Sequence, residues 1–123
     1  MLDDRTLLLP DRRGNNRIDS LRNIIADPRV GLLFLIPGVN ETLRVSGTAK
    51  ISTDPDLISR CVAQDKAPTS VLVIAIQSVF FQCARALMRS HLWSADAQIS
   101  REALPSNGTI VATLSQNAID AAT

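Results

Sequence analysis

A strict alternation of apolar and polar residues from Glu41 to Thr53 constrains the fold of this chain more than any other stretch. A side-chain period of two places one set of residues on one face of a β-strand and the other set on the opposite face. The first set is Leu43, Val45, Gly47, Ala49 and Ile51, and the second is Thr42, Arg44, Ser46, Thr48, Lys50 and Ser52. We therefore predict one long strand with an apolar face.

The residues before this strand predict a hairpin. Val30 to Ile36 is a continuous apolar run, which is typical of a strand buried on both faces. Pro37 to Asn40 has the composition of a turn. Two strands joined by so short a turn pair as a hairpin.

Two further strands are expected from their apolar content. Leu2 to Leu9 is predicted to form a strand at the N-terminus. Thr69 to Ile76 is predicted to form a buried strand that continues towards Phe80 and Phe81. With the hairpin, these segments supply a mostly antiparallel sheet.

Helices are predicted between the strands. Apolar residues at helical spacing begin a helix at Ile18, and Pro28 ends it near Asp27. The sequence Thr53-Asp54-Pro55 combines a capping residue with a proline in the first turn, so a second helix begins there and continues to about Val62.

The C-terminal third gives weaker signals. Helical spacing of apolar residues predicts a short helix from Gln82 to Ser90. Ser94 to Asn107 is polar and is expected to be irregular, and a final helix is expected to begin within Asn117 to Thr123. Together these elements predict an α+β fold, with short helices flanking a sheet that curls into a barrel, in a single domain over residues 1–123.

Composition excludes several classes of function. Thirteen basic and twelve acidic residues leave a formal charge of +1, and aromatic residues make up only 3%, which argues against a nucleic-acid partner. Two cysteines without a C-x-x-C motif and a single histidine argue against a metal site. Apolar runs are too short to span a membrane, and Asp3, Asp4 and Arg5 interrupt any signal peptide, so we expect a cytoplasmic protein with reduced, packed thiols.

The stretch Asp11 to Asn23, D-R-R-G-N-N-R-I-D-S-L-R-N, suits a phosphate group. Gly14 allows a positive φ and a close approach of the backbone, and Arg17 offers a planar fork of donors. The helix that follows adds unpaired N–H groups. A solvated surface turn with no ligand is the alternative interpretation, because the stretch matches neither G-x-G-x-x-G nor a P-loop.

The runs L-L-L-P-D-R-R-G-N-N-R-I-D-S-L-R-N-I, P-R-V-G-L-L-F-L-I-P-G and E-T-L-R-V-S-G-T-A together resemble the pyridoxamine 5'-phosphate oxidase-like proteins. More narrowly, the chain is similar to their probable FMN-dependent subfamily, from about Leu7 to about Gly108. The resemblance implies a split β-barrel that forms a homodimer, with two FMN sites at the interface. It also implies two-electron redox chemistry on a small-molecule substrate that it does not identify.

The resemblance assigns candidate site residues. Asn16 and Arg17 match the positions that bind the FMN phosphate, with Arg13 and Ser20 as possible neighbours. Glu41 and Thr42, with Arg44 after them, open the strand that lies along the flavin ring in relatives; an ordinary exposed strand end is the alternative. Glu41-Thr42 stands where pyridoxamine phosphate oxidases proper have an Arg-Gln pair, which puts vitamin B6 activity in doubt.

A second family signature spans Phe80 to Trp93. In the resemblance this segment reaches the partner's flavin, which would involve Arg85, Arg89 and Ser90; the alternative is a helix whose arginines are solvated while Cys83 packs. No catalytic residue is identified, and flavin enzymes do not require one for hydride transfer.

Two rival functions remain. A related cofactor, deazaflavin or haem, could use the same barrel, and haem would need the single histidine, His91, as its axial ligand. A non-catalytic module that stores or senses flavin, or a shortened inactive copy, is the second rival. It is favoured because the helix and strand that precede this point in relatives do not precede Leu2 here.

Overall fold

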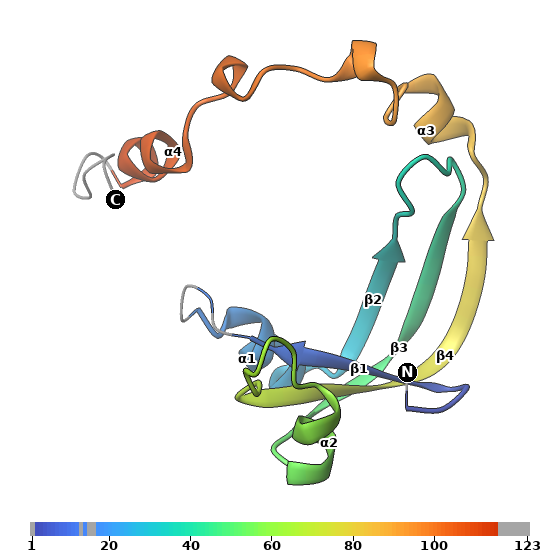
Figure 1. Ribbon diagram of the computed structural model, residues 1–123, viewed down its shortest axis with the longest axis vertical. Helices are drawn as coiled ribbons and strands as arrows, with labels where there is room; N and C mark the ends of the chain where they lie inside the picture. The colour runs from blue at the N-terminus through green and yellow to red at the C-terminus, as the bar shows by residue number, and fades with distance from the viewer. Residues whose placement is uncertain (1, 13, 15–16, 116–123) are drawn as a thin grey trace. The chain divides into compact units, whose positions relative to one another are not determined.

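The computed structural model describes residues 2–12, 14 and 17–115. The chain divides into two compact units, Met1–Arg85 and Ala86–Thr123. The first unit is a four-stranded antiparallel sheet with the strand order β1-β4-β3-β2 (Figure 1). The strands are β1 (Thr6–Asp11), β2 (Arg29–Phe34), β3 (Thr42–Ser52) and β4 (Ser70–Gln82).

The predicted hairpin is confirmed. β2 and β3 pair with Phe34 opposite Leu43 and Arg29 opposite Thr48. The Val39 N–H donates to the Ile36 carbonyl at 2.9 Å in the connecting turn, where Gly38 has φ +84°, a conformation that glycine adopts without strain.

A β-bulge interrupts the pairing of β3 with β4. Ser46 faces Ser78 whereas Gly47 faces Ile76, so Gln77 is an extra residue in β4. A Cβ atom at Gly47 would lie 2.1 Å from the Ala75 carbonyl oxygen, so only glycine allows this approach of the two backbones. Bulges bend strands and increase their twist, and β3 and β4 curve along their length in Figure 1.

β1 begins later than the sequence predicts. The Asp3 carboxylate accepts hydrogen bonds from the Arg5 N–H at 2.8 Å and the Thr6 hydroxyl at 3.1 Å, and this local turn delays the strand to Thr6. β1 also continues past Pro10, which lies opposite Val71. Proline is tolerated there because β1 is an edge strand of the described sheet.

Two helices pack on the sheet. α1 (Asp19–Ala26) contacts β3 and ends before Pro28, as predicted. α2 (Pro55–Arg60) contacts β4; its N-cap is Asp54, whose side chain accepts from the Asp56 N–H at 2.9 Å. The predicted start of α2 is confirmed, and its end falls at Arg60, shortly before the expected Val62.

The core lies where three strands run together. Ile74 on β4 is opposite Leu7 on one side and Ala49 on the other, and Ile74 and Ala49 are both buried. Val45 and Val71 are also buried. The predicted apolar face of β3 is therefore the face that forms much of this core.

β2 does not meet its prediction. The sequence predicts burial on both faces for Val30 to Ile36, but the strand ends at Phe34, and Leu33 and Phe34 are exposed. The physical reason is its position: β2 is an edge strand in the described sheet, with β3 as its one neighbour. A continuous apolar run indicates contact with other surfaces, but it does not say that those surfaces belong to the same chain.

The second unit contains short helices. α3 (Arg85–Arg89) begins in the first unit and is shorter than the predicted Gln82 to Ser90. Two 3-10 turns, Ala95–Ala97 and Arg101–Ala103, occupy the region predicted to be irregular. α4 (Asn107–Leu114) was not predicted, and the predicted start of a helix within 117–123 lies outside the described residues.

The α+β class is confirmed by the antiparallel sheet and its short helices. None of the helices formed by the described residues has the length and apolar character needed to cross a bilayer. The single-domain organisation stays a prediction.

Candidate functional site

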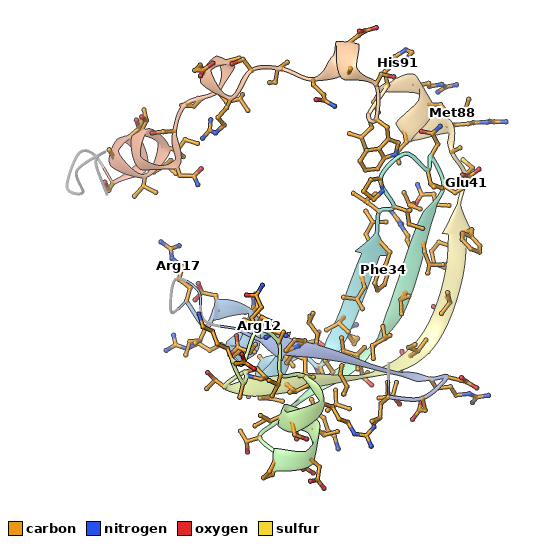
Figure 2. All side chains as sticks on the ribbon, in the orientation of Figure 1. Arg12, Arg17, Phe34, Glu41, Met88 and His91 are labelled. Carbon is orange, nitrogen blue, oxygen red and sulfur yellow. The ribbon has the colours of Figure 1, made fainter. Side chains whose placement is uncertain are left out.

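The predicted phosphate turn follows β1 directly. Of its candidate residues, Arg13 and Asn16 lie outside the described residues, whereas Arg17 and Ser20 are described and exposed. Gly14 is exposed as well, and the conformational role predicted for it stays a prediction. Figure 2 shows the Arg17 side chain projecting away from the sheet.

The N-terminus of α1 adds to this turn. Ile18 is the N-cap residue, and among the described residues no side chain caps the helix, so backbone N–H groups of the first turn have no intrahelical or capping partner there. Ser20 lies in that turn with its hydroxyl at the surface. Asp19 in the same turn already provides a negative charge that interacts favourably with the positive end of the helix dipole. An anion bound here would therefore depend on Arg17 to outweigh Asp19.

The second group of candidates lies at the other end of the hairpin. Glu41 is exposed and precedes β3, while Thr42 is buried and opposite Gln82. β3 runs from Thr42 to Ser52, and its Ser52 end lies near the end of β1 and the turn that follows β1. Thr42 is therefore roughly 30 Å along the strand from the end that lies near that turn. Within one chain, the structure does not bring Arg17 and Glu41 together (Figure 2).

The third group follows β4. Arg85, Arg89 and Ser90 are all exposed, and the Ser90 hydroxyl donates to the Leu87 carbonyl at 3.1 Å. Cys83 is exposed, in contrast to the packed thiol expected, and Cys61 is half-buried; both are free thiols.

His91 has a structural role at the end of α3. Its φ is 51°, its N–H donates to the Met88 carbonyl at 3.2 Å, and the next N–H, that of Leu92, donates to the Leu87 carbonyl at 3.2 Å. These two bonds are those of a Schellman motif with His91 in the left-handed position. This helix cap accounts for the backbone geometry of His91 without a ligand.

A hollow of about 730 Å³ that sequence reasoning missed lies between the end of β1 and the loop after α2. Its described lining residues are Arg12, Ala63, Gln64, Lys66, Ala67 and Thr69. Arg12 Nη2 donates to the Cys61 carbonyl at 2.9 Å and holds the loop against β1 (Figure 2). The pairing of Arg12 with a residue 49 positions away leaves no signal in a single sequence.

The start of β2 carries a carboxyl group whose pKa is shifted by its hydrogen bonds. Hydrogen bonds from the Arg29 side chain, then from its N–H, lower the pKa of Asp27 from 3.8 to about 2. Both side chains are at the surface, so the pair fixes the entry into β2 and does not form a reactive centre. Within the described part of the chain, no group of acidic, histidine or cysteine residues is arranged to hold a metal ion.

Two solved structures share the fold. A histidine-to-alanine variant of tagged HupZ from Group A Streptococcus aligns with a TM-score of 0.54 and 23% identity, covering 67% of this chain and 70% of that chain. Tagged HupZ without that change gives a TM-score of 0.53 and 22% identity, covering 66% of each chain. These similarities identify the split-barrel fold. No match was found among curated proteins.

The family model described as pyridoxamine 5'-phosphate oxidase matches residues 1–83. This range holds the phosphate turn, all of β1 to β3 and β4 through Gln82. The match covers well over half of the 123 residues and includes the whole described sheet. The chain therefore belongs to the pyridoxamine 5'-phosphate oxidase family.

Proposed function

We propose that the chain is an FMN-binding protein of this family that carries out two-electron redox chemistry on a small molecule as a homodimer. The observation that carries the proposal is the family match over residues 1–83, because it includes the basic turn after β1. The substrate remains open.

The donors at the phosphate end support this cofactor. Arg17 supplies a cation, Ser20 a hydroxyl and the uncapped start of α1 backbone N–H groups, all at one end of the sheet. These are the donor types that bind phosphate in proteins. The residues present therefore fit the phosphate of FMN, and Arg13 and Asn16 belong to the same proposal.

A homodimer is supported by an apolar surface that one chain leaves open. The register places Phe34, Leu43 and Phe81 in one row across the sheet, with Val45 and Val79 in the next row on the same face. Phe34, Val79 and Phe81 are exposed. We call Phe34, Leu43, Val79 and Phe81 the open apolar face. Apolar surface of this kind is typical of obligate dimer interfaces.

A homodimer would also bring together candidate residues that are far apart within one chain. Arg17 and Glu41 lie near opposite ends of β3 in one chain, so a flavin held by Arg17 of one protomer would meet Glu41, Thr42 or Arg85 of its partner. Bound FMN would supply the electron transfer itself. The chain would bind the phosphate, orient the ring and exclude water.

The test is an FMN titration of the purified protein, followed by absorption and flavin fluorescence. We expect saturable binding, and we expect Arg17→Ala to weaken it by more than about tenfold, since one charge-assisted contact has that effect. The matched control is Arg5→Ala, which removes an exposed arginine at the other end of β1 and should leave affinity unchanged. Equal affinity in Arg17→Ala and the wild type would contradict the assigned phosphate site.

A second measurement separates an enzyme from a storage module. Reduced nicotinamide nucleotide and a chemical reductant are each added to the FMN-loaded protein, and re-oxidation by a panel of small acceptors is followed. Turnover with any acceptor supports redox catalysis. Tight FMN binding without turnover would favour the storage or sensor function.

A further inference from the structure

An asparagine followed by a glycine begins α4 (Figure 1). Among the asparagines of the sequence, Asn107 alone precedes a glycine, Gly108. Asn107 is the first residue of the helix, and its side chain is exposed. Because glycine carries no Cβ, no side chain obstructs an approach to its backbone nitrogen. The pair can therefore react between the asparagine side chain and the next peptide nitrogen.

The reacting groups have no hydrogen-bond partner within the described part of the chain. The Gly108 N–H lies in the first turn of α4, where no intrahelical acceptor exists. The bonds that begin the helix come instead from the Thr109 N–H, to the Ser106 hydroxyl at 3.0 Å, and from the Ile110 N–H, to the Ser106 carbonyl at 3.0 Å. Among the described groups, none therefore holds the Gly108 nitrogen or the Asn107 amide in place.

The helical backbone keeps these two groups apart. A Cα–Cβ bond in a helix tilts towards the N-terminus, so the Asn107 side chain is directed away from the Gly108 nitrogen, which follows it in the chain. The reaction therefore needs the first turn to open. Ser106 resists that opening, since its side chain accepts from the Thr109 N–H and also lies 2.9 Å from the Thr109 hydroxyl.

The rest of α4 opposes the opening only weakly. Gly108 and the β-branched residues that follow it lower the helix propensity. Among the residues of α4, Ala112 is the one that is buried. Helix ends open before helix centres do. The Ser106 cap is therefore the contact that decides how often the first turn opens.

We propose that Asn107 is a site of spontaneous deamidation and that the Ser106 cap controls its rate. When the turn opens, hydroxide removes the Gly108 amide proton, and the nitrogen attacks the side-chain carbonyl carbon of Asn107, Cγ. A bond forms between Cγ and the Gly108 nitrogen, and the bond from Cγ to the Asn107 amide nitrogen breaks. That nitrogen leaves as ammonia with a proton from water, which regenerates hydroxide. One water molecule then opens the succinimide ring at either carbonyl, giving aspartate or isoaspartate.

The two products change α4 in opposite directions. Aspartate places a carboxylate in the first turn, where it interacts favourably with the positive end of the helix dipole. Isoaspartate adds a methylene group to the backbone before Gly108, so the Thr109 N–H no longer meets the Ser106 hydroxyl. Either product takes the formal net charge from +1 to zero.

The test incubates the full chain in ¹⁸O-labelled water at neutral and at mildly alkaline pH, followed by tryptic digestion in ordinary water and fragmentation mass spectrometry. Label marks only the rings that opened during the incubation. We expect label at Asn107, at a rate that rises with pH, and far less at Asn23, an exposed asparagine of α1 that precedes the branched Ile24. Gly108→Ala should lower the rate at least about tenfold, since its methyl group obstructs the attack. Equal labelling of Asn107 and Asn23 would overturn the proposal, as would an unlabelled Asn107 in the folded protein when the guanidinium-unfolded chain is fully labelled.

Ser106→Ala tests the role of the cap. Loss of an N-cap shifts the opening equilibrium about fivefold, so the rate at Asn107 should rise about fivefold in the folded protein. Ser106→Thr keeps a hydroxyl and should keep the wild-type rate. In guanidinium, where no helix forms, all three chains should react at one rate. A wild-type rate in folded Ser106→Ala, or a difference that persists unchanged in guanidinium, would overturn the role of Ser106. None of these measurements requires bound flavin.

Discussion

The two halves of β4 differ in their surroundings. Ser70 to Ile76 lies between β1 and β3, and Ile74 is 1% exposed. From Gln77 to Gln82 the strand pairs with β3 alone among the described residues, and Phe81 is 77% exposed. Ile74 and Phe81 lie on the same face of the sheet. Both are large apolar residues, so their different exposure comes from what covers each position.

The two halves of β4 therefore have different roles. The covered half, with Ile74 against Leu7 and Ala49, stabilises the fold of one chain. The uncovered half presents the open apolar face, whose burial would stabilise an assembly. Substitutions in the first half should lower the free energy of unfolding, and substitutions in the second should change association.

Ile74→Ala tests the covered half and has the largest expected effect. It removes a fully buried side chain and leaves a cavity, so the free energy of unfolding should fall by about 2–5 kcal/mol. Urea denaturation measures it. Val79→Ala, at a position 52% exposed on the same strand, is the control and should cost less than about 1 kcal/mol in the monomer. Equal losses would show that the two halves are covered alike.

Gly47→Ala tests the junction between the halves. The new Cβ would lie 2.1 Å from the Ala75 carbonyl oxygen, so the strands must separate, at a cost of about 1–3 kcal/mol. The control is Gly31→Ala on β2, where nothing lies within 4 Å of the added atom. Thermal unfolding should show a lower Tm for the first variant and little change for the second. A wild-type Tm in Gly47→Ala would mean that the bulge does not require glycine.

Phe81→Glu tests the uncovered half. A charge in the open apolar face should raise the dimer dissociation constant at least about tenfold, by analytical ultracentrifugation, since a buried unpaired charge is costly. Ile25→Glu is the control, because Ile25 on α1 is 76% exposed but lies outside that face. Dissociation by both variants, or by neither, would contradict the assigned interface.

Asp27→Asn is expected to have the smallest effect, which is a change in how the stability of the fold depends on pH. Because hydrogen bonds from Arg29 lower the folded-state pKa of Asp27 from 3.8 to about 2, the ionised form stabilises the fold above pH 3.8. That contribution should be lost as the pH falls towards about 2. Unfolding between pH 5 and roughly pH 2 should therefore show a steeper loss of stability in the wild type than in the variant. Parallel curves would show that the pair does not contribute.

Periodicity predicted most of the sheet. The alternation from Glu41 to Thr53 located β3, and the Asp54-Pro55 signal located α2, because both signals act through neighbouring residues. The burial of β2 was predicted wrongly because an apolar run does not reveal whether a strand is central or at an edge. α4 was missed because Gly108 and β-branched residues lower its helix propensity. Its one local signal was Ser106, which accepts from the Thr109 N–H at 3.0 Å.

The candidate site was less predictable than the fold. The turn after β1 could be found because its residues are contiguous. The hollow depends on Arg12 reaching Cys61 and on positive φ at Gln64 and Asp65, which these residue types do not signal. In the proposed homodimer, Arg17 and Glu41 would serve one cofactor only across two copies.

Pro10 makes the two outer edges of the sheet unequal. A foreign strand laid along β1 would find no N–H at that position, whereas β2 contains no proline from Arg29 to Phe34. An added strand would therefore pair with β2 in preference to β1. A contact that uses the same edge of both copies is self-complementary and stops at two, while alternating edges would allow endless growth. In any assembly formed by strand addition to the described sheet, Pro10 would thus favour a closed pair over a fibre.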